Sequence, residues 1–397
     1  MLLIINTGSS SLKSKIYKEK SLKEIAEITI EKIGEKKSIV TIHNDSKEKN
    51  TISKAKIENH NKAITTLMQL LLNEKIISDY SKIKAIGHRV VHGGEKYSKP
   101  TKITPKVIKE IEKLSKLAPL HNPVNLQGIY ALQEILPNIP HIAIFDTAFH
   151  QTMKEKAFRY AIPHKFYKKH NIRRYGFHGI SHQYIVEKTQ KLLRKKRSKI
   201  VTCHLGNGAS ITASVDGKSI DTTMGLTPLE GIIMGTRSGS IDPSIPLYLQ
   251  ESLGYSTKEV TTILNNESGL KAISRISNDM RDIYAKSLRK FSFKNKSANL
   301  AINMLAYQIA KQIGAYAAAM NGIDAITFTA TLGENAFYVR EKALENLKFL
   351  GLNVNKKANS ENAEIISDKK SSIKVFILKT DEELQIANNM RKFLTKS

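Results

Sequence analysis

Residues 2–11 have the sequence LLIINTGSSS, in which a short apolar run ends in a turn of Asn, Thr, Gly and Ser. Residues 200–210, with the sequence IVTCHLGNGAS, repeat this pattern. An alternating segment follows each turn, and after the second one Asp216 and Gly217 give a hairpin signal. Glycine permits a tight turn, and the exposed N–H groups and hydroxyls of such a turn form a cradle for anions. The pair of turns therefore predicts two related lobes that hold one phosphate chain.

Each turn alone is also explained as an ordinary β-turn. A third strand that leads into a glycine turn, over residues 326–335, favours the phosphate interpretation. The chain has no Walker loop, because no glycine run ends in Gly-Lys-Ser/Thr, and no GxGxxG follows a strand. We therefore expect a nucleotide site, if present, to use the hairpin design.

The composition is that of a globular protein. The 397 residues suffice for two domains, with an apolar content of 41% and a charged content of 25%. The single cysteine, Cys203, excludes an internal disulfide and is typical of a reducing cytosol; a small buried strand residue explains it better than a nucleophile. Neither a secretory leader nor a run of ~20 apolar residues occurs, so we expect a cytoplasmic protein without a membrane partner.

A net charge of +27 first suggests nucleic-acid binding. The lysines are scattered along the chain, however, and Lys, Asn and Ile are all abundant, which A/T-rich codons would explain. No zinc-finger spacing, basic zipper or aromatic RNA-binding signature occurs. We therefore expect a solvated lysine surface and no nucleic-acid partner, with salt-dependent attraction of anionic substrates.

Strands and helices alternate along the chain, which predicts an α/β fold. Thr104 as N-cap and Pro105 at the first helical position begin a helix that we expect to stop at Pro119. Further helices are expected near 124–136 and 298–320, and strands within 1–52 and at 141–145, 325–330 and 373–378. Asp146 ends the strand 141–145, where open α/β sheets place ligand-contacting residues; a cap of the next turn is the alternative.

Two arginines stand beside glycines after apolar segments: Arg89 in HRVVHGG and Arg237 in MGTRSG. A guanidinium fork matches phosphate and carboxylate oxygens, although a surface ion pair is the commoner fate of an arginine. His178 and His182 have the spacing of a metal pair on a helix, but Gly179 interrupts it and no glutamate follows, so a phosphate-contacting imidazole fits better than zinc.

Residues 380–383, with the sequence TDEE, fit a capping box in which Thr380 caps a helix and Glu383 reaches back to it. This interpretation leaves Glu382 for Mg²⁺, which keeps most of its waters and needs few protein oxygens. His121, in the loop sequence PLHNP, is open to a structural interpretation.

Taken together, these segments resemble the acetokinase family of the sugar kinase/Hsp70/actin superfamily over nearly the whole chain. The motifs that carry the resemblance are residues 6–13, 87–94, 119–123, 145–150, 173–179, 204–210 and 224–237. The resemblance implies two related lobes of the actin-like ATPase (ribonuclease H-like) type with a cleft between them. Residues 1–148 plus 383–397 would form the N-terminal lobe, with the acid and Mg²⁺ sites, and residues 149–382 the nucleotide-binding lobe.

The same resemblance implies a role for each matched residue. Asp146, His178 and Arg237 match catalytic positions, the latter two as transition-state stabilisers; Arg89 and His121 are assigned to the acid substrate, and Asn6 and Glu382 to Mg²⁺. The residues assigned to ATP are Lys13, His204, Leu205, Gly206, Asn207, Gly208, Asp279, Met280, Arg281, Thr331, Leu332, Gly333, Glu334 and Asn335. Thr331 departs from the family by replacing the first glycine of the adenosine loop, and Ser240 by replacing an aspartate.

The implied reaction is ATP + acetate ⇌ ADP + acetyl phosphate, in a homodimer. We expect direct in-line transfer. Because a carboxylate is already ionised at neutral pH, Asp146 need not act as a base and is expected to orient Arg89, Arg237 or a metal-bound water. A kinase for propionate or another short acid is the nearest alternative, and a catalytically idle ATP-binding scaffold is an alternative of another class.

Overall fold

The computed structural model describes residues 1–45, 51–119, 121–289 and 293–395. The chain forms two compact units: unit 1 is Met1–Ala148 with Asp381–Ser397, and unit 2 is Phe149–Thr380. The division differs at two positions from the boundary expected from the sequence, which gave residues 381 and 382 to the nucleotide-binding lobe. The reason is local: Asp381 caps a helix whose buried face packs on the sheet of unit 1.

Unit 1 contains an eight-stranded sheet in the order β5-β4-β3-β2-β1-β6-β8-β7. Its strands are β1 (Leu2–Thr7), β2 (Ser11–Tyr17), β3 (Glu24–Glu31), β4 (Ser38–Asn44), β5 (Thr51–Ala55), β6 (Ala85–Val90), β7 (Thr101–Lys102) and β8 (His141–Phe145). Its helices are α1 (His60–Asn73), η1 (Tyr80–Lys82), α2 (Pro105–Leu114), α3 (Asn122–Ile135) and α15 (Glu382–Leu394).

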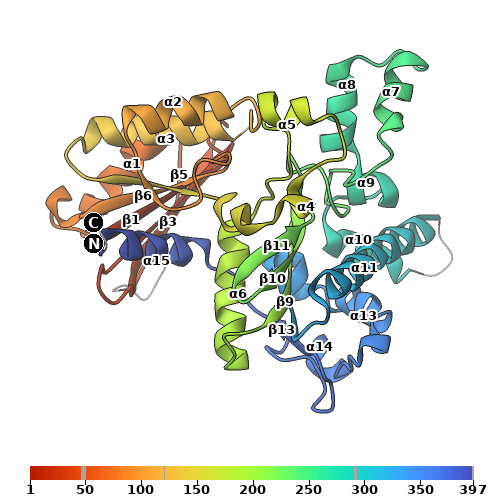
Figure 1. Ribbon diagram of the computed structural model, residues 1–397. Helices are drawn as coiled ribbons and strands as arrows, with labels where there is room; N and C mark the ends of the chain where they lie inside the picture. Colours follow the sequence, from red (N-terminus) through yellow and green to blue (C-terminus); the bar gives the residue numbers. More distant parts are fainter. Residues whose placement is uncertain (46–50, 120, 290–292, 396–397) are drawn as a thin grey trace. The chain divides into compact units, whose positions relative to one another are not determined.

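Helices cover both faces of this sheet. Helices α1 and α3 contact β1, β2 and β6, and α15 also contacts β1 and β6 but, as Figure 1 shows, from the opposite side. The close packing of helices on both faces requires glycine at two positions. A Cβ on Gly87 in β6 would overlap Met390 of α15, and a Cβ on Gly128 in α3 would lie 2.9 Å from Thr7 Cγ2. Close packing on both sides of β1 and β6 therefore fixes the residues at the ends of these strands.

Unit 2 contains a five-stranded sheet in the order β11-β10-β9-β12-β13. Its strands are β9 (Lys199–Leu205), β10 (Ala209–Val215), β11 (Lys218–Thr222), β12 (Ala325–Thr329) and β13 (Lys374–Ile377). Its helices are α4 (Glu155–Phe158), α5 (His164–His170), α6 (Gly179–Leu193), α7 (Ser244–Glu251), α8 (Thr257–Thr262), η3 (Ile263–Glu267), α9 (Gly269–Ser274), α10 (Met280–Ser287), α11 (Phe293–Met320), α12 (Ala330–Asn335), α13 (Phe337–Glu345), η4 (Lys348–Leu350) and α14 (Lys356–Ser360). The turn η2 (Ala148–Thr152) joins the units along the chain.

The strands of unit 2 position its glycine turn. β9 pairs antiparallel with β10 and parallel with β12, so residues 206–208 form a tight connection at the carboxyl end of β9. Helix α6 contacts β9 and β12, and α11 contacts β10 and β9 (Figure 1). Asp216 and Gly217, with φ of 53° and 79°, join β10 to β11, which confirms the hairpin expected there.

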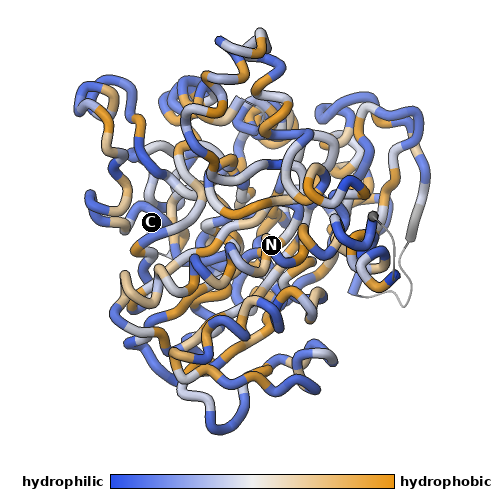
Figure 2. The backbone as a smooth tube through the Cα atoms, turned by 90° about the vertical axis from the view of Figure 1, so that its right-hand side faces the viewer, coloured by the Kyte–Doolittle hydropathy of each residue, from blue (hydrophilic) through white to orange (hydrophobic). Residues whose placement is uncertain are grey.

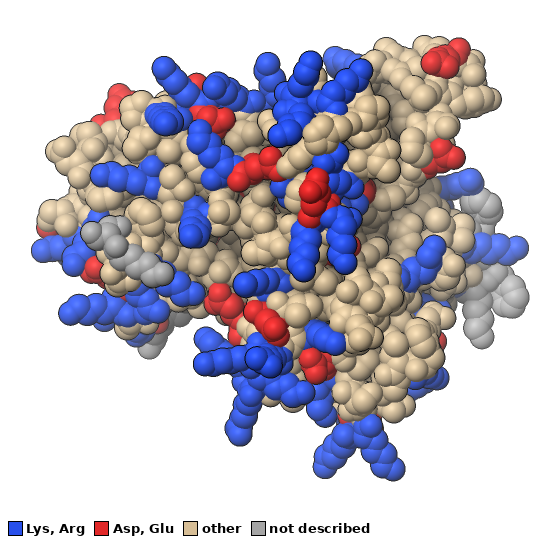
Figure 3. All heavy atoms as spheres, in the orientation of Figure 1, with Lys and Arg blue, Asp and Glu red and all other residues tan. Residues whose placement is uncertain are grey.

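Hydrophobic and hydrophilic stretches alternate along the backbone tube in Figure 2. Strands β8 and β12 are buried along their whole length, as the core requires. Cys203 is buried in β9, and burial raises the pKa of its thiol, so the structural interpretation of this cysteine holds. On the face drawn in Figure 3, Lys and Arg side chains are spread among neutral and acidic ones instead of forming one patch. Among the described residues, no helix has both the length and the apolar character needed to cross a bilayer.

Some local expectations are confirmed and others are wrong. Thr104 caps α2, with Pro105 in its first turn, but the helix ends at Leu114, before Pro119. The capping box at Thr380 is wrong: Asp381 is the N-cap and accepts from Leu384 N at 3.0 Å, whereas Thr380 bonds to Ser181. The glycine turn expected over residues 326–335 is instead strand β12 followed directly by helix α12.

Candidate functional site

The first glycine turn in unit 1 is closed by a bond from Gly8 N to Ser11 O of 2.8 Å. Asn6 and Lys13 flank this turn as directly paired residues of β1 and β2. Both donate to the same carboxylate: Glu383 accepts from Asn6 Nδ2 at 3.3 Å and from Lys13 Nζ at 3.0 Å. The N-terminus of α15 is thereby attached to the turn, so the sequence-predicted residues Asn6, Lys13 and Glu382 lie in one neighbourhood.

Arg89, in β6, is the centre of this neighbourhood. Its Nη2 donates to Asp146 Oδ2 at 2.9 Å, its Nη1 donates to Asn6 Oδ1 at 3.4 Å, and its Nε lies 3.7 Å from Glu382 Oε2. Burial alone would lower the pKa of Arg89, but Asp146 and Glu382 outweigh it and raise that pKa. Among the described residues, Arg89 Nε has no hydrogen-bond acceptor although it is buried, so this donor is available for a ligand.

The charges around Arg89 are suited to a bound cation. Burial raises the pKa of Glu382 to about 7, with Asp146 and Glu383 adding to the effect and Arg89 opposing it. Three carboxylates here share the two cations Arg89 and Lys13, and the raised pKa of Glu382 means that added positive charge is favourable at this position. Among the described residues no group of three or more His, Cys, Asp or Glu forms a metal cluster. A Mg²⁺ ion that keeps most of its waters and takes few protein oxygens fits both observations.

His178 and Arg237 meet at the glycine turn of unit 2. A Cβ on Gly208 would lie 3.4 Å from His178 Nε2 and 3.5 Å from Arg237 Nη1, so the bare glycine leaves room beside both donors. His178 has φ of 56°, which is uncommon outside glycine, and it precedes α6. Its ring stacks on His204 with centroids 4.2 Å apart. Arg237 Nη1 donates to Pro228 O at 3.2 Å, and burial lowers the pKa of Arg237.

Asn207 connects this turn to neighbouring loops. Gly235 N donates to Asn207 O at 3.0 Å, and Asn278 Nδ2 donates to Asn207 Oδ1 at 3.3 Å. Ser240, which departs from the family pattern, closes the loop that carries Arg237, because its hydroxyl accepts from Gly231 N at 3.0 Å.

A cavity of about 790 Å³ in unit 2 adjoins the turn and brings together most of the residues assigned to ATP. The predicted residues that line it are Gly206, Asn207, Asp279, Met280, Arg281, Thr331, Leu332 and Asn335. Sequence reasoning missed its aromatic wall, in which the rings of Tyr284 and Tyr338 stack with centroids 3.6 Å apart. Its walls are largely apolar, as in sites that bind an aromatic base.

Other predicted residues do not line this cavity. Gly333 is buried inside α12, and Glu334 lies on the same helix as Thr331, Leu332 and Asn335, which line the cavity. His204 and Leu205 end β9 directly before the turn, and Gly208 lies in the turn beside Gly206 and Asn207. His121 is the N-cap residue of α3 in unit 1, but its side chain accepts no capping hydrogen bond from that helix. Its neighbour Leu120, part of the 119–123 motif, lies outside the described residues.

Several buried histidines make the stability of the protein depend on pH. Burial lowers the pKa of His92 to about 4, and His92 Nδ1 accepts from Gly94 N at 3.1 Å. Burial also lowers the pKa values of His88 and His182 well below the ordinary value. Since the folded pKa values are lower than the unfolded value of ~6.5, this stability is present above pH 6.5 and is lost as the pH falls toward the folded pKa.

We therefore expect the free energy of unfolding, measured with urea, to fall between pH 7.5 and 5.5, with each such histidine contributing roughly 1 kcal/mol. His164 is exposed, so His164→Gln should leave the pH dependence of the free energy of unfolding unchanged. His92 is buried, so His92→Gln should weaken that dependence. A flat profile between these pH values would contradict the prediction.

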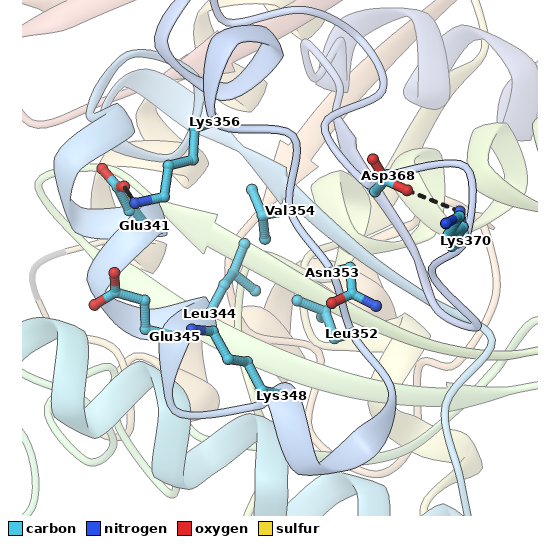
Figure 4. Close-up of a pocket in the computed structure, with 10 residues that line it drawn as sticks. All are labelled: Glu341, Leu344, Glu345, Lys348, Leu352, Asn353, Val354, Lys356, Asp368 and Lys370. Atoms are coloured by element: carbon cyan, nitrogen blue, oxygen red, sulfur yellow. Dashed lines mark hydrogen bonds and ion pairs between the residues drawn. The ribbon is translucent and has the colours of Figure 1, made fainter.

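A second cavity in unit 2, of about 430 Å³, lies between α13 and the segment that follows η4 (Figure 4). Its charged side chains are partly engaged with the protein itself: Lys356 Nζ lies 3.3 Å from Glu341 Oε1, and Asp368 accepts from Lys370 N at 2.9 Å. It contains none of the predicted site residues, so we do not place the chemistry there.

The two mixed sheets and the glycine turn beside His178 and Arg237 define a phosphotransferase of the actin-like ATPase fold. Comparison with known proteins gives the family: the chain belongs to the acetokinase family, whose profile matches residues 1–388. The acetate kinase of Caldanaerobacter subterraneus subsp. tengcongensis is 49% identical over 99% of this chain and 98% of its own.

Solved structures agree with this assignment. The acetate kinase of Porphyromonas gingivalis superposes with a TM-score of 0.91 at 38% identity, covering 99% of each chain. A propionate kinase from Francisella tularensis superposes with a TM-score of 0.91 at 40% identity, covering 98% of each chain. The predicted fold class and the resemblance are confirmed by these findings.

Proposed function

We propose that this protein is a kinase that transfers the γ-phosphoryl group of ATP to acetate, reversibly and by direct in-line displacement. Its membership of the acetokinase family and its full-length similarity to acetate kinases support the activity. The observation on the molecule that carries the proposal is Arg89: a buried guanidinium, oriented by Asp146, whose Nε lacks an acceptor among the described residues. A carboxylate substrate supplies that acceptor.

The chemistry requires cations more than a base. Acetate is ionised near neutral pH, with a pKa of roughly 4, so no proton has to be removed. The difficulty is the approach of an anion to a polyanionic phosphate, which positive charge and preorganised donors relieve. In unit 1 we assign Arg89 and His121 to the acid, with Asp146 orienting Arg89; in unit 2 we assign His178 and Arg237 to the phosphoryl group.

We assign Asn6 and Glu382 to Mg²⁺, which when bound neutralises phosphate charge. Lys13, His204, Leu205, Gly206, Asn207 and Gly208 are assigned to the phosphates of ATP, and Asp279, Met280, Arg281, Thr331, Leu332, Gly333, Glu334 and Asn335 to its nucleoside. We also propose a homodimer, on the resemblance alone, and a cytoplasmic location without a nucleic-acid partner, on the composition and motifs of the sequence.

Phosphorylation of propionate is the second candidate, because the Francisella tularensis neighbour is a propionate kinase. A hydroxamate assay for acyl phosphate with acetate, propionate and butyrate decides between them. We expect the kcat/KM for acetate to exceed that for propionate by roughly tenfold, since one added methylene changes binding by that order. EDTA should abolish the activity and Mg²⁺ should restore it. A preference for propionate would select the alternative, and no acyl phosphate with any acid would indicate an idle scaffold.

A further inference from the structure

A chain of hydrogen bonds in unit 2 runs from the sheet to His178. Thr202 Oγ1, on β9, lies 2.6 Å from His182 Nδ1 on α6. His182 Nε2 lies 2.8 Å from Ser210 Oγ on β10, and Ser210 Oγ lies 2.9 Å from His178 Nδ1. Thr202, His182 and Ser210 are completely buried, so water does not compete for these bonds.

The proton of the Thr202 hydroxyl gives this chain a direction. Within the described ranges, His182 is the only hydrogen-bond partner of that hydroxyl. A buried hydroxyl that donates to nothing costs free energy, so Thr202 donates and His182 Nδ1 accepts. Burial, with His150 and His204 nearby, lowers the pKa of His182 well below its ordinary value, so the ring is neutral and carries one proton. That proton is therefore on Nε2.

The directions of the two remaining bonds follow because the Ser210 hydroxyl has only one proton to donate. His182 Nε2–H donates to Ser210 Oγ, and Ser210 then donates its own proton to His178 Nδ1. A His178 ring that accepts at Nδ1 keeps its proton at Nε2. This is the nitrogen that lies beside the bare Gly208 backbone, next to Arg237 Nη1.

We propose that Thr202, His182 and Ser210 are positioning residues that hold His178 in the tautomer with its proton on Nε2, ready to donate to a phosphoryl oxygen. The tautomer itself depends only on the buried bonds, whereas its use in phosphoryl transfer rests on the proposed function. The opposite tautomer would direct a lone pair at an anion. A donor fixed before the reaction needs no reorganisation as charge develops in the transition state.

The tautomer can be observed without any assay of activity. In protein with ¹⁵N-labelled histidine, long-range ¹H–¹⁵N spectra distinguish a protonated ring nitrogen from an unprotonated one, and the signals missing in His178→Gln identify His178. We expect His178 to show a protonated Nε2 and an unprotonated Nδ1 in the wild type and in Thr202→Ser, which keeps the hydroxyl. In Thr202→Val and in Ser210→Ala we expect a mixture of tautomers.

Kinetics provide the second measurement. Thr202→Val should lower kcat about fivefold to tenfold, the effect of weakening one neutral hydrogen bond, with the KM for ATP nearly unchanged and with activity restored in Thr202→Ser. Thr327→Val is the matched control: Thr327 pairs directly with Thr202 in the sheet, is completely buried, and bonds to Thr189 at 2.9 Å instead of to a histidine. It should lose stability but keep kcat.

The outcomes separate this inference from the proposed function. A protonated Nδ1 on His178 in the wild type, or an unaltered tautomer in both Thr202→Val and Ser210→Ala, would overturn the inference even if the enzyme makes acetyl phosphate. Equal losses of kcat in Thr202→Val and Thr327→Val would reduce Thr202 to a structural residue. The expected spectra in a protein that phosphorylates no acid would leave the tautomer standing and reject the function.

Discussion

Replacement of Arg237 by alanine is expected to lower kcat about 1000-fold and to raise the KM for ATP less than about tenfold. Arg237 lies beside Gly208 and His178 Nε2. Among the described residues its Nη1 bonds only to the Pro228 carbonyl and the Met234 sulfur, neither of which is an anion, so its charge is not neutralised there. Such a charge has most effect when a phosphoryl group is in transfer. The measurement is steady-state kinetics with saturating acetate and varied ATP.

Two further variants make this result specific. Arg237→Lys keeps the charge but lacks the planar fork, so an intermediate kcat is expected. Arg197→Ala removes the same charge from an exposed position in unit 2 and should leave both constants unchanged. If Arg237→Ala retained the wild-type kcat, Arg237 would have no role in the transition state.

Replacement of Arg89 by alanine is expected to raise the KM for acetate roughly 100-fold, the effect of losing charge-assisted hydrogen bonds to a carboxylate. The KM for ATP should change much less. The structural reason is the buried Nε without an acceptor among the described residues, on a side chain already fixed by Asp146. An unaltered KM for acetate would reject the assignment of Arg89 to the acid.

Arg89→Ala also leaves the almost completely buried Asp146 without its cation, which destabilises the folded protein. A second variant therefore has to separate loss of acetate binding from loss of folding. Arg89→Lys retains a positive charge for Asp146 and Glu382 but cannot form the same fork. We expect its thermal unfolding to stay close to that of the wild type while its KM for acetate remains high. Loss of acetate binding in both variants, with an intact fold in Arg89→Lys, would separate recognition from stability.

Features set by neighbouring residues were predictable from the sequence. Thr104 and Pro105 begin a helix because one supplies a cap and the other tolerates the first turn. Asp216 and Gly217 form the hairpin because both adopt positive φ. The two glycine turns, with Asn6 and Asn207, were found from local runs of Gly, Asn and Ser, and Arg89 and Arg237 from the glycines beside them.

Features that depend on distant contacts were not predictable in this way. The sequence alone assigned Glu383 to a helix cap, but its partners Asn6 and Lys13 belong to the first two strands, so it lies in the site with Glu382. The stack of Tyr284 on Tyr338 joins α10 to α13 and has no local signal. The buried bonds of His182 likewise cross from α6 to two strands, and the spacing to His178 suggested only a weak metal pair.

The position of α15 has a consequence for the order in which the protein is made. The strands of the first sheet are synthesised before unit 2, but Glu382 and Glu383 follow all of it along the chain. The part of the chain with Arg89 and Asp146 therefore emerges from the ribosome long before Glu382 and Glu383, whose carboxylates lie beside Arg89 and Lys13 in the folded protein. During that interval Gly87 lacks its contact with Met390, and the Mg²⁺ site that we propose at Asn6 and Glu382 is incomplete until the last helix is made.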